Sequence, residues 1–89
     1  MFNFVGDSVM TSRQFSERLN KELDDIGMPT HYSERAKAFA KLTKLPRFKA
    51  LNLLNGSTLP DPLVLKLLAQ EFEVNEDWLI GKSNKRALN

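Results

Sequence analysis

The stretch that decides the fold is residues 33–60, which read SERAKAFAKLTKLPRFKALNLLNGSTLP. In its first half, apolar and small residues recur at intervals of three and four, as on one face of a helix: Ala36, Phe39, Ala40 and Thr43. Ser33 is placed to be the N-cap of this helix. The other helical face carries Lys37, Lys41 and Lys44. We therefore expect a short amphipathic helix with a basic outer surface.

The second half of the same stretch predicts another short helix. Pro46 suits the first helical turn, where a missing N–H costs nothing, and Gly56 suits the position just after the last turn. We expect this helix over residues 46–55. Two short helices joined by a tight turn form a helix-turn-helix, and a helix of this size fits the major groove of B-DNA.

Helical signals also precede this unit. Thr11 and Gln14 can cap a helix, and Gly27 and Pro29 can end it. Between them, apolar residues at intervals of four, four and three predict one buried stripe: Phe15, Leu19, Leu23 and Ile26.

Two more helices are predicted after it. Asp61 followed by Pro62 is a start signal, and the expected buried stripe behind it is Leu63, Val64, Leu67, Leu68 and Phe72. Asn75, with two acidic residues after it, starts a brief last helix that carries Trp78, Leu79 and Ile80. No segment alternates as strands do. The expected fold is all-α, a compact bundle of about five short helices.

Length and composition support one folded domain. The chain has 89 residues, of which 42% are hydrophobic and 27% charged, within the ordinary globular range. We divide it into an apolar N-terminal segment at residues 1–10, a domain at 11–82 and a polar tail at 83–89 that we expect to be frayed. With no cysteine, disulfides and thiolate metal sites are excluded. We expect no membrane segment and a cytoplasmic protein.

The charge is unevenly distributed. Residues 1–34 hold three basic and six acidic side chains, residues 35–58 six basic and none acidic, and residues 59–89 four basic and five acidic. All of the positive excess thus falls in the segment that contains the two short helices. Such a concentration is typical of a surface that binds phosphates.

Several residues of this chain carry a resemblance to a known family: FAKL at 39–42, Leu45, Ala50, Gly56, Leu59-Pro60 and the run FEVNEDWLIGK at 72–82. Over residues 15–82 the chain resembles the XRE family of phage-repressor-like and Cro-like regulators. The family often has glycine in the turn where this chain has Lys44. The resemblance implies a lambda-repressor-like fold and a transcriptional regulator, with repression as its expected role. It also implies a homodimer on double-stranded DNA with a palindromic operator, and residues 1–10 are our candidate for the dimer contact.

The resemblance also implies which residues would contact DNA. Arg47, Phe48 and Asn52 would face base edges, and Lys49 would lie between bases and backbone. Arginine can pair with guanine and asparagine with adenine, whereas Phe48 offers only apolar contact and could instead pack inside the protein. The expected phosphate contacts are Arg35, Lys37, Lys41, Lys44, Asn55, Ser57 and Thr58.

Other functions remain open at this point. A protein-interaction module, such as an adaptor or an antitoxin-like partner, could use the same helices. An enzyme finds no support, because no nucleophile and base pair, glycine-rich phosphate loop or metal spacing is present. His31 is the single histidine, and we expect no cofactor.

Overall fold

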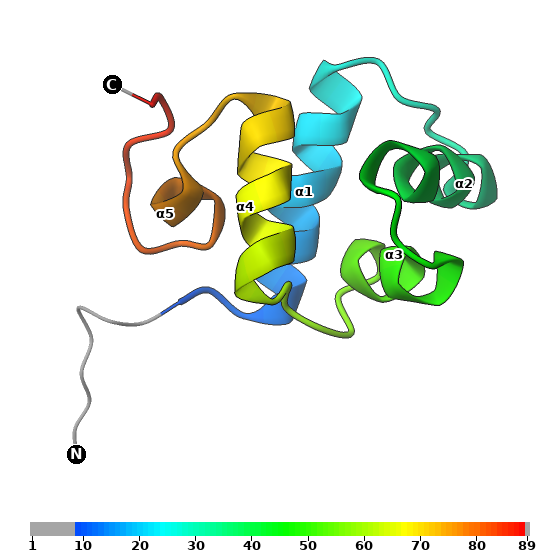
Figure 1. Ribbon diagram of the computed structural model, residues 1–89, viewed down its shortest axis with the longest axis horizontal. Coiled ribbons are helices and arrows are strands. Elements are labelled where there is room, and N and C mark those ends of the chain that lie inside the picture. The colour runs from blue at the N-terminus through cyan, green and yellow to red at the C-terminus, as the bar shows by residue number, and fades with distance from the viewer. Residues whose placement is uncertain (1–8, 89) are drawn as a thin grey trace.

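Five helices and no strand make up residues 9–88, the part of the chain that the computed structural model describes (Figure 1). The helices are α1 (Ser12–Asp25), α2 (Tyr32–Thr43), α3 (Arg47–Leu54), α4 (Pro62–Phe72) and α5 (Glu76–Leu79). In Figure 1, α2 and α3 lie on one side of α1 and α4, and α5 lies on the other. The predicted all-α bundle is confirmed.

Three of the expected helix starts are confirmed by their hydrogen bonds. Thr11 and Gln14 form a reciprocal capping box at α1. Asp61 accepts a bond of 2.9 Å from the backbone N–H of Val64 at α4, and Pro62 occupies the first turn. Asn75 caps α5 through the N–H of Asp77. These caps satisfy backbone donors that have no partner inside a helix.

The helix-turn-helix is present with shifted boundaries. The extended residue before α2 is His31, whose carbonyl accepts the N–H of Arg35 at 2.8 Å, so His31 and not Ser33 is the N-cap. Pro46 is the N-cap of α3 and Asn55 its C-cap, which makes α3 shorter by one residue at each end than predicted. The turn of residues 44–46 is closed by Lys44 in the left-handed conformation, with φ of 60°.

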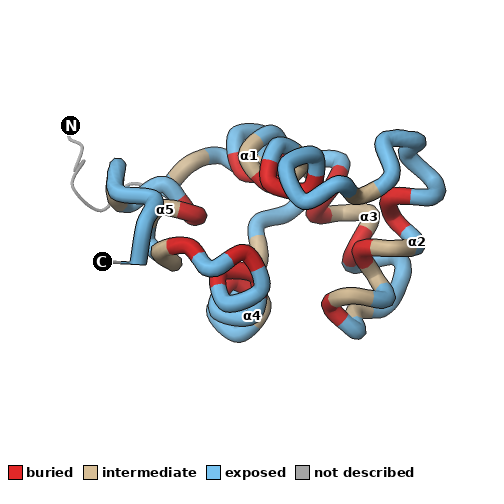
Figure 2. The backbone as a smooth tube through the Cα atoms, turned by 90° about the horizontal axis from the view of Figure 1, so that it is seen from above, coloured by how far each residue is buried: buried red, intermediate tan, exposed pale blue. Residues whose placement is uncertain are grey.

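The core is one cluster to which all five helices contribute, and Figure 2 shows the buried positions facing the interior of the bundle. The side chains that are fully buried in it are Phe15, Leu19, Leu23, Ala36, Phe39, Ala50, Leu68, Val74 and Leu79. Ala40 is half-buried and packs against this cluster.

The predicted stripe of α4 is wrong in part. Leu63 is 81% exposed and Leu67 is also exposed. The helix instead buries the face formed by Leu65, Leu68, Ala69 and Phe72. Ile26, expected on the buried stripe of α1, is 54% exposed, because it follows the helix as its C-cap residue and leaves the helical face.

A close approach fixes α3 against α1. The hydroxyl of Ser12 donates to the carbonyl of Gly56 at 2.7 Å, and the Asn20 amide donates to the carbonyl of Leu54 at 3.1 Å. Gly56 has a φ of 82°, and a Cβ there would lie 3.2 Å from Oγ of Ser16. Glycine therefore serves both the turn after α3 and the contact with α1.

The C-terminal tail is held in place, contrary to the frayed tail that we expected. The carbonyl of Arg86 accepts the N–H of Asn75 at 2.8 Å, and the Arg86 guanidinium forms an ion pair of 2.6 Å with the buried Glu22. The hydrogen bond that the Arg86 side chain donates to Glu22 raises the pKa of Arg86. Trp78 is half-buried against the core, with the guanidinium of Arg18 4.3 Å from its ring centre.

The N-terminal segment that we assigned to the dimer contact lies outside the described residues from position 1 to 8. Its last residue, Met10, packs against the core and donates its N–H to the carbonyl of Ile80 at 3.1 Å. Within residues 9–88, no helix has the length and apolar character needed to cross a bilayer.

Candidate nucleic-acid interface

The basic segment at residues 35–58 presents five of its six positive side chains to solvent. The exposed ones lie on the outer face of α2, in the turn and at the start of α3: Lys37, Lys41, Lys44, Arg47 and Lys49. Among the described residues, the ion pairs within 4 Å are Arg35 with Asp24 and Arg86 with Glu22. The five exposed charges are therefore not neutralised by carboxylates of that part of the chain.

Arg35 is the exception, and the expectation that it contacts phosphate is corrected. Its side chain is only 6% exposed. Its guanidinium donates to the carbonyls of Met28 and Pro29, to the Asn20 carbonyl and side chain, and to Asp24 at 2.5 Å. Arg35 thus joins α1, the following loop and α2, and has no exposed donor to offer a DNA backbone.

The start of α3 carries three consecutive exposed side chains. Arg47, Phe48 and Lys49 occupy its first three positions, and Asn52 is partly exposed one turn later. Pro46 begins the helix without a side-chain cap, and the first turn of α3 carries no acidic residue. Phe48 is 63% exposed, so the alternative that it packs inside the protein is excluded.

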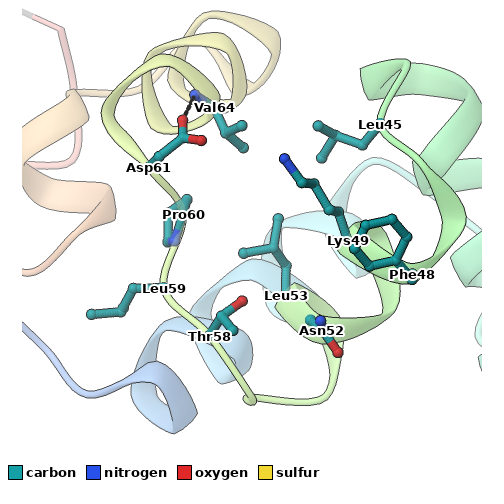
Figure 3. A pocket seen from close by; sticks show the side chains of 10 residues that line it. All are labelled: Leu45, Phe48, Lys49, Asn52, Leu53, Thr58, Leu59, Pro60, Asp61 and Val64. Carbon is teal, nitrogen blue, oxygen red and sulfur yellow. Dashed lines mark hydrogen bonds between the residues drawn. The ribbon is translucent and has the colours of Figure 1, made fainter.

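A groove of about 230 Å³ lies between α3 and the start of α4. Figure 3 shows Lys49 pointing from α3 toward α4, with Leu53 at the centre of the opening and Thr58 opposite Asn52. The remaining lining comes from the turn, the α3–α4 loop and the first turn of α4, and is mostly apolar: Leu45, Phe48, Leu59, Pro60, Asp61 and Val64.

The three polar residues predicted to meet phosphate after α3 have different positions. Asn55 and Ser57 pair with each other, since the Asn55 side-chain oxygen accepts both the N–H of Ser57 at 2.9 Å and its hydroxyl. They close the turn and do not line the groove. Thr58 does line it. All three are exposed.

The structure thus brings together Phe48, Lys49, Asn52 and Thr58 around one groove. Arg47 lies at the same helix end without lining it, and Lys37 and Lys41 lie on α2. Sequence reasoning missed the apolar part of the groove. The available signal was Leu59, an apolar residue beside proline in a predicted loop.

Comparison of the chain with family models, with curated proteins and with solved structures gives no match.

Proposed function

We propose that this chain is a sequence-specific regulator that binds double-stranded DNA and reads the major groove with α3. The observation that carries the proposal is the uncompensated positive charge around the exposed start of this helix. A helix presented in this way can enter the major groove, where side chains distinguish all four base pairs.

The polar side chains of α2, the turn and α3 each have a chemical role in this proposal. Arg47 can donate two parallel bonds to guanine, Asn52 can pair with adenine, and Lys49 can serve guanine or a phosphate. Lys37, Lys41 and Lys44 would bind phosphates, which adds affinity but no sequence preference. The chain would act as a repressor by occupying its operator.

Selection of bound duplexes from a random DNA pool tests this function. We expect a preferred sequence, on which Arg47→Ala lowers affinity by about 1–3 kcal/mol and relaxes one base position. Arg47→Lys is the matched control, because it keeps the charge but loses the planar fork. It should keep most of the non-specific affinity and lose the base preference. An equal loss on every duplex after Arg47→Ala would show that α3 does not read bases.

We also propose that the chain binds its operator as a homodimer, because one helix of this size reads only a few base pairs. Sedimentation on a palindromic selected duplex should give two chains per site. Removal of residues 1–8 should weaken dimerisation if this apolar segment forms the contact. A dimer of unchanged affinity would exclude residues 1–8 from the interface.

A protein-interaction module is the second candidate, favoured by one observation. Leu63 in the first turn of α4 is 81% exposed, and Leu59 and Leu67 are also exposed, so apolar surface accompanies the basic surface. Salt dependence distinguishes the two functions. DNA affinity should fall steeply as salt rises, because bound phosphates release counterions, whereas an apolar protein contact would be almost insensitive to salt.

A further inference from the structure

Phe48 differs in chemistry from the other exposed side chains of α3, the helix that we propose to read DNA. It is the second residue of α3 and is 63% exposed. A phenyl ring can neither donate nor accept the hydrogen bonds by which base edges are read. A single exposed apolar residue would need no explanation, but Phe48 forms part of the lining of a groove.

The groove has an apolar interior and a polar edge. Leu45, Leu53, Pro60 and Val64 lie around it together with the Phe48 ring, and Figure 3 shows these side chains gathered about the opening between α3 and α4. At about 230 Å³ it is larger than a methyl group. It can therefore receive small apolar groups from a partner that lies along α3.

The charge around the groove favours DNA as that partner. Lys49 lines the groove, and further exposed cations lie on α2 and in the turn of the same helix-turn-helix. The acidic side chain in the lining, Asp61, is engaged as the N-cap of α4 with Val64. A polyanion that presents an apolar group matches this combination better than an apolar peptide does.

Only one apolar group is presented by base pairs in the major groove, the C5-methyl of thymine. Asn52 lies four residues after Phe48, so the two side chains share one helical face. Since asparagine pairs with adenine and adenine pairs with thymine, these two residues can read the same or adjacent A·T pairs.

We propose that the groove beside Phe48 receives thymine methyl groups, so that the chain reads A·T pairs by apolar contact as well as by hydrogen bonds. This inference rests on the proposed DNA-binding function. It assigns a specificity-determining role to Phe48 and to the α3–α4 loop.

Uracil substitution tests the inference directly. In the duplex selected from the random pool, the thymidines are replaced one at a time by deoxyuridine, which lacks only the methyl group. Affinity should fall about fourfold at one or two positions, the factor expected for one buried methyl group. Substitution by 5-bromouracil, which restores a group of similar size, should recover it.

The Phe48→Ala variant, measured on the thymine and uracil duplexes, tests whether Phe48 makes the contact. It should bind the thymine duplex more weakly than the parent chain and should no longer distinguish thymine from uracil. Because Phe48 is exposed, the thermal unfolding of the variant should match that of the parent chain. Ile26→Ala is the matched control, since Ile26 is also exposed but lies after α1, outside the groove, and it should keep the full thymine preference.

The possible outcomes distinguish a failure of this inference from a failure of the proposed DNA-binding function. If no duplex is selected, the DNA-binding function fails and the inference fails with it. If a sequence is selected but every uracil substitution is neutral, DNA binding stands and the groove does not read thymine, as expected for a groove that binds a protein. A thymine preference that survives in Phe48→Ala also overturns the inference.

Discussion

The junction of α1 and α2 around Arg35 and the start of α3 around Arg47 use the same side chain in opposite ways. Both arginines belong to the acid-free segment at residues 35–58. Arg35 is buried and makes five hydrogen bonds, to Asn20 and Asp24 of α1 and to the loop after this helix. Arg47 is exposed and makes no side-chain bond within the described part of the chain.

This difference shows how a basic segment divides between fold and function. A guanidinium whose donors are all occupied inside the protein stabilises the arrangement of the helices. A guanidinium whose donors face water can replace that bound water with a phosphate or a guanine at little cost. Burial and bonding distinguish the two, and composition does not.

The largest expected effect is on stability at Arg35. Arg35→Ala removes five hydrogen bonds, and we expect the free energy of unfolding to fall by about 3 kcal/mol. Asp24 is 56% exposed, so its charge stays solvated and adds little to the loss. Urea denaturation followed by circular dichroism measures the change.

Arg47→Ala is the control for this experiment. We expect a change of less than about 0.5 kcal/mol, as for other exposed sites without special contacts. Equal losses for the two variants would mean that the two arginines do not differ in structural role.

A smaller effect is expected at the turn between α2 and α3. Lys44 has a φ of 60°, a conformation that costs a residue with a Cβ roughly 1 kcal/mol and glycine almost nothing. Lys44→Gly should therefore stabilise the fold by about 1 kcal/mol and still weaken the proposed DNA binding, because it removes a cation that we propose to bind phosphate. Thermal unfolding and a DNA titration measure the two effects.

Glu73→Gly is the matched variant for Lys44→Gly. Glu73 closes α4 with a φ of 58° and lies outside the basic segment. It should give a similar gain in stability without loss of DNA affinity. A loss of stability in both variants would contradict the assigned strain.

The smallest effect is expected at a single exposed lysine of α2. Lys41→Ala should leave stability and base preference unchanged and reduce the slope of log affinity against log salt by about one unit. Lys66→Ala on α4 is the control, because Lys66 is exposed near Glu73 and Glu76, and its slope should equal that of the parent chain. Identical slopes for all three proteins would remove the outer face of α2 from the interface.

Local signals in the sequence were sufficient for much of the fold. The caps at Thr11, Asp61 and Asn75 were predicted because a cap depends on residues within one turn of each other. The buried face of α4 was not, since its sequence PLVLKLLAQEF is apolar at most positions. Periodicity alone cannot choose between two apolar faces, and packing selects the one with Leu65 and Ala69.

The misassigned Arg35 and the ordered tail depend on contacts between distant parts of the chain. Arg35 finds its acceptors on α1 and in the loop before α2, and Arg86 meets Glu22, which is 64 positions away. Neither pairing has a local pattern. The start of α3 was predicted to within one residue from the local signal of Pro46, but the sequence left open whether Phe48 faces outward or packs inside.

The close contact of Gly56 with α1 has a thermodynamic consequence for binding. Because the end of α3 is fixed by Ser12 and Asn20 before any partner arrives, little conformational entropy is lost when α3 is immobilised on a ligand. A calorimetric titration should then show a small negative heat-capacity change, set by the apolar surface that is covered and without the large contribution of coupled folding.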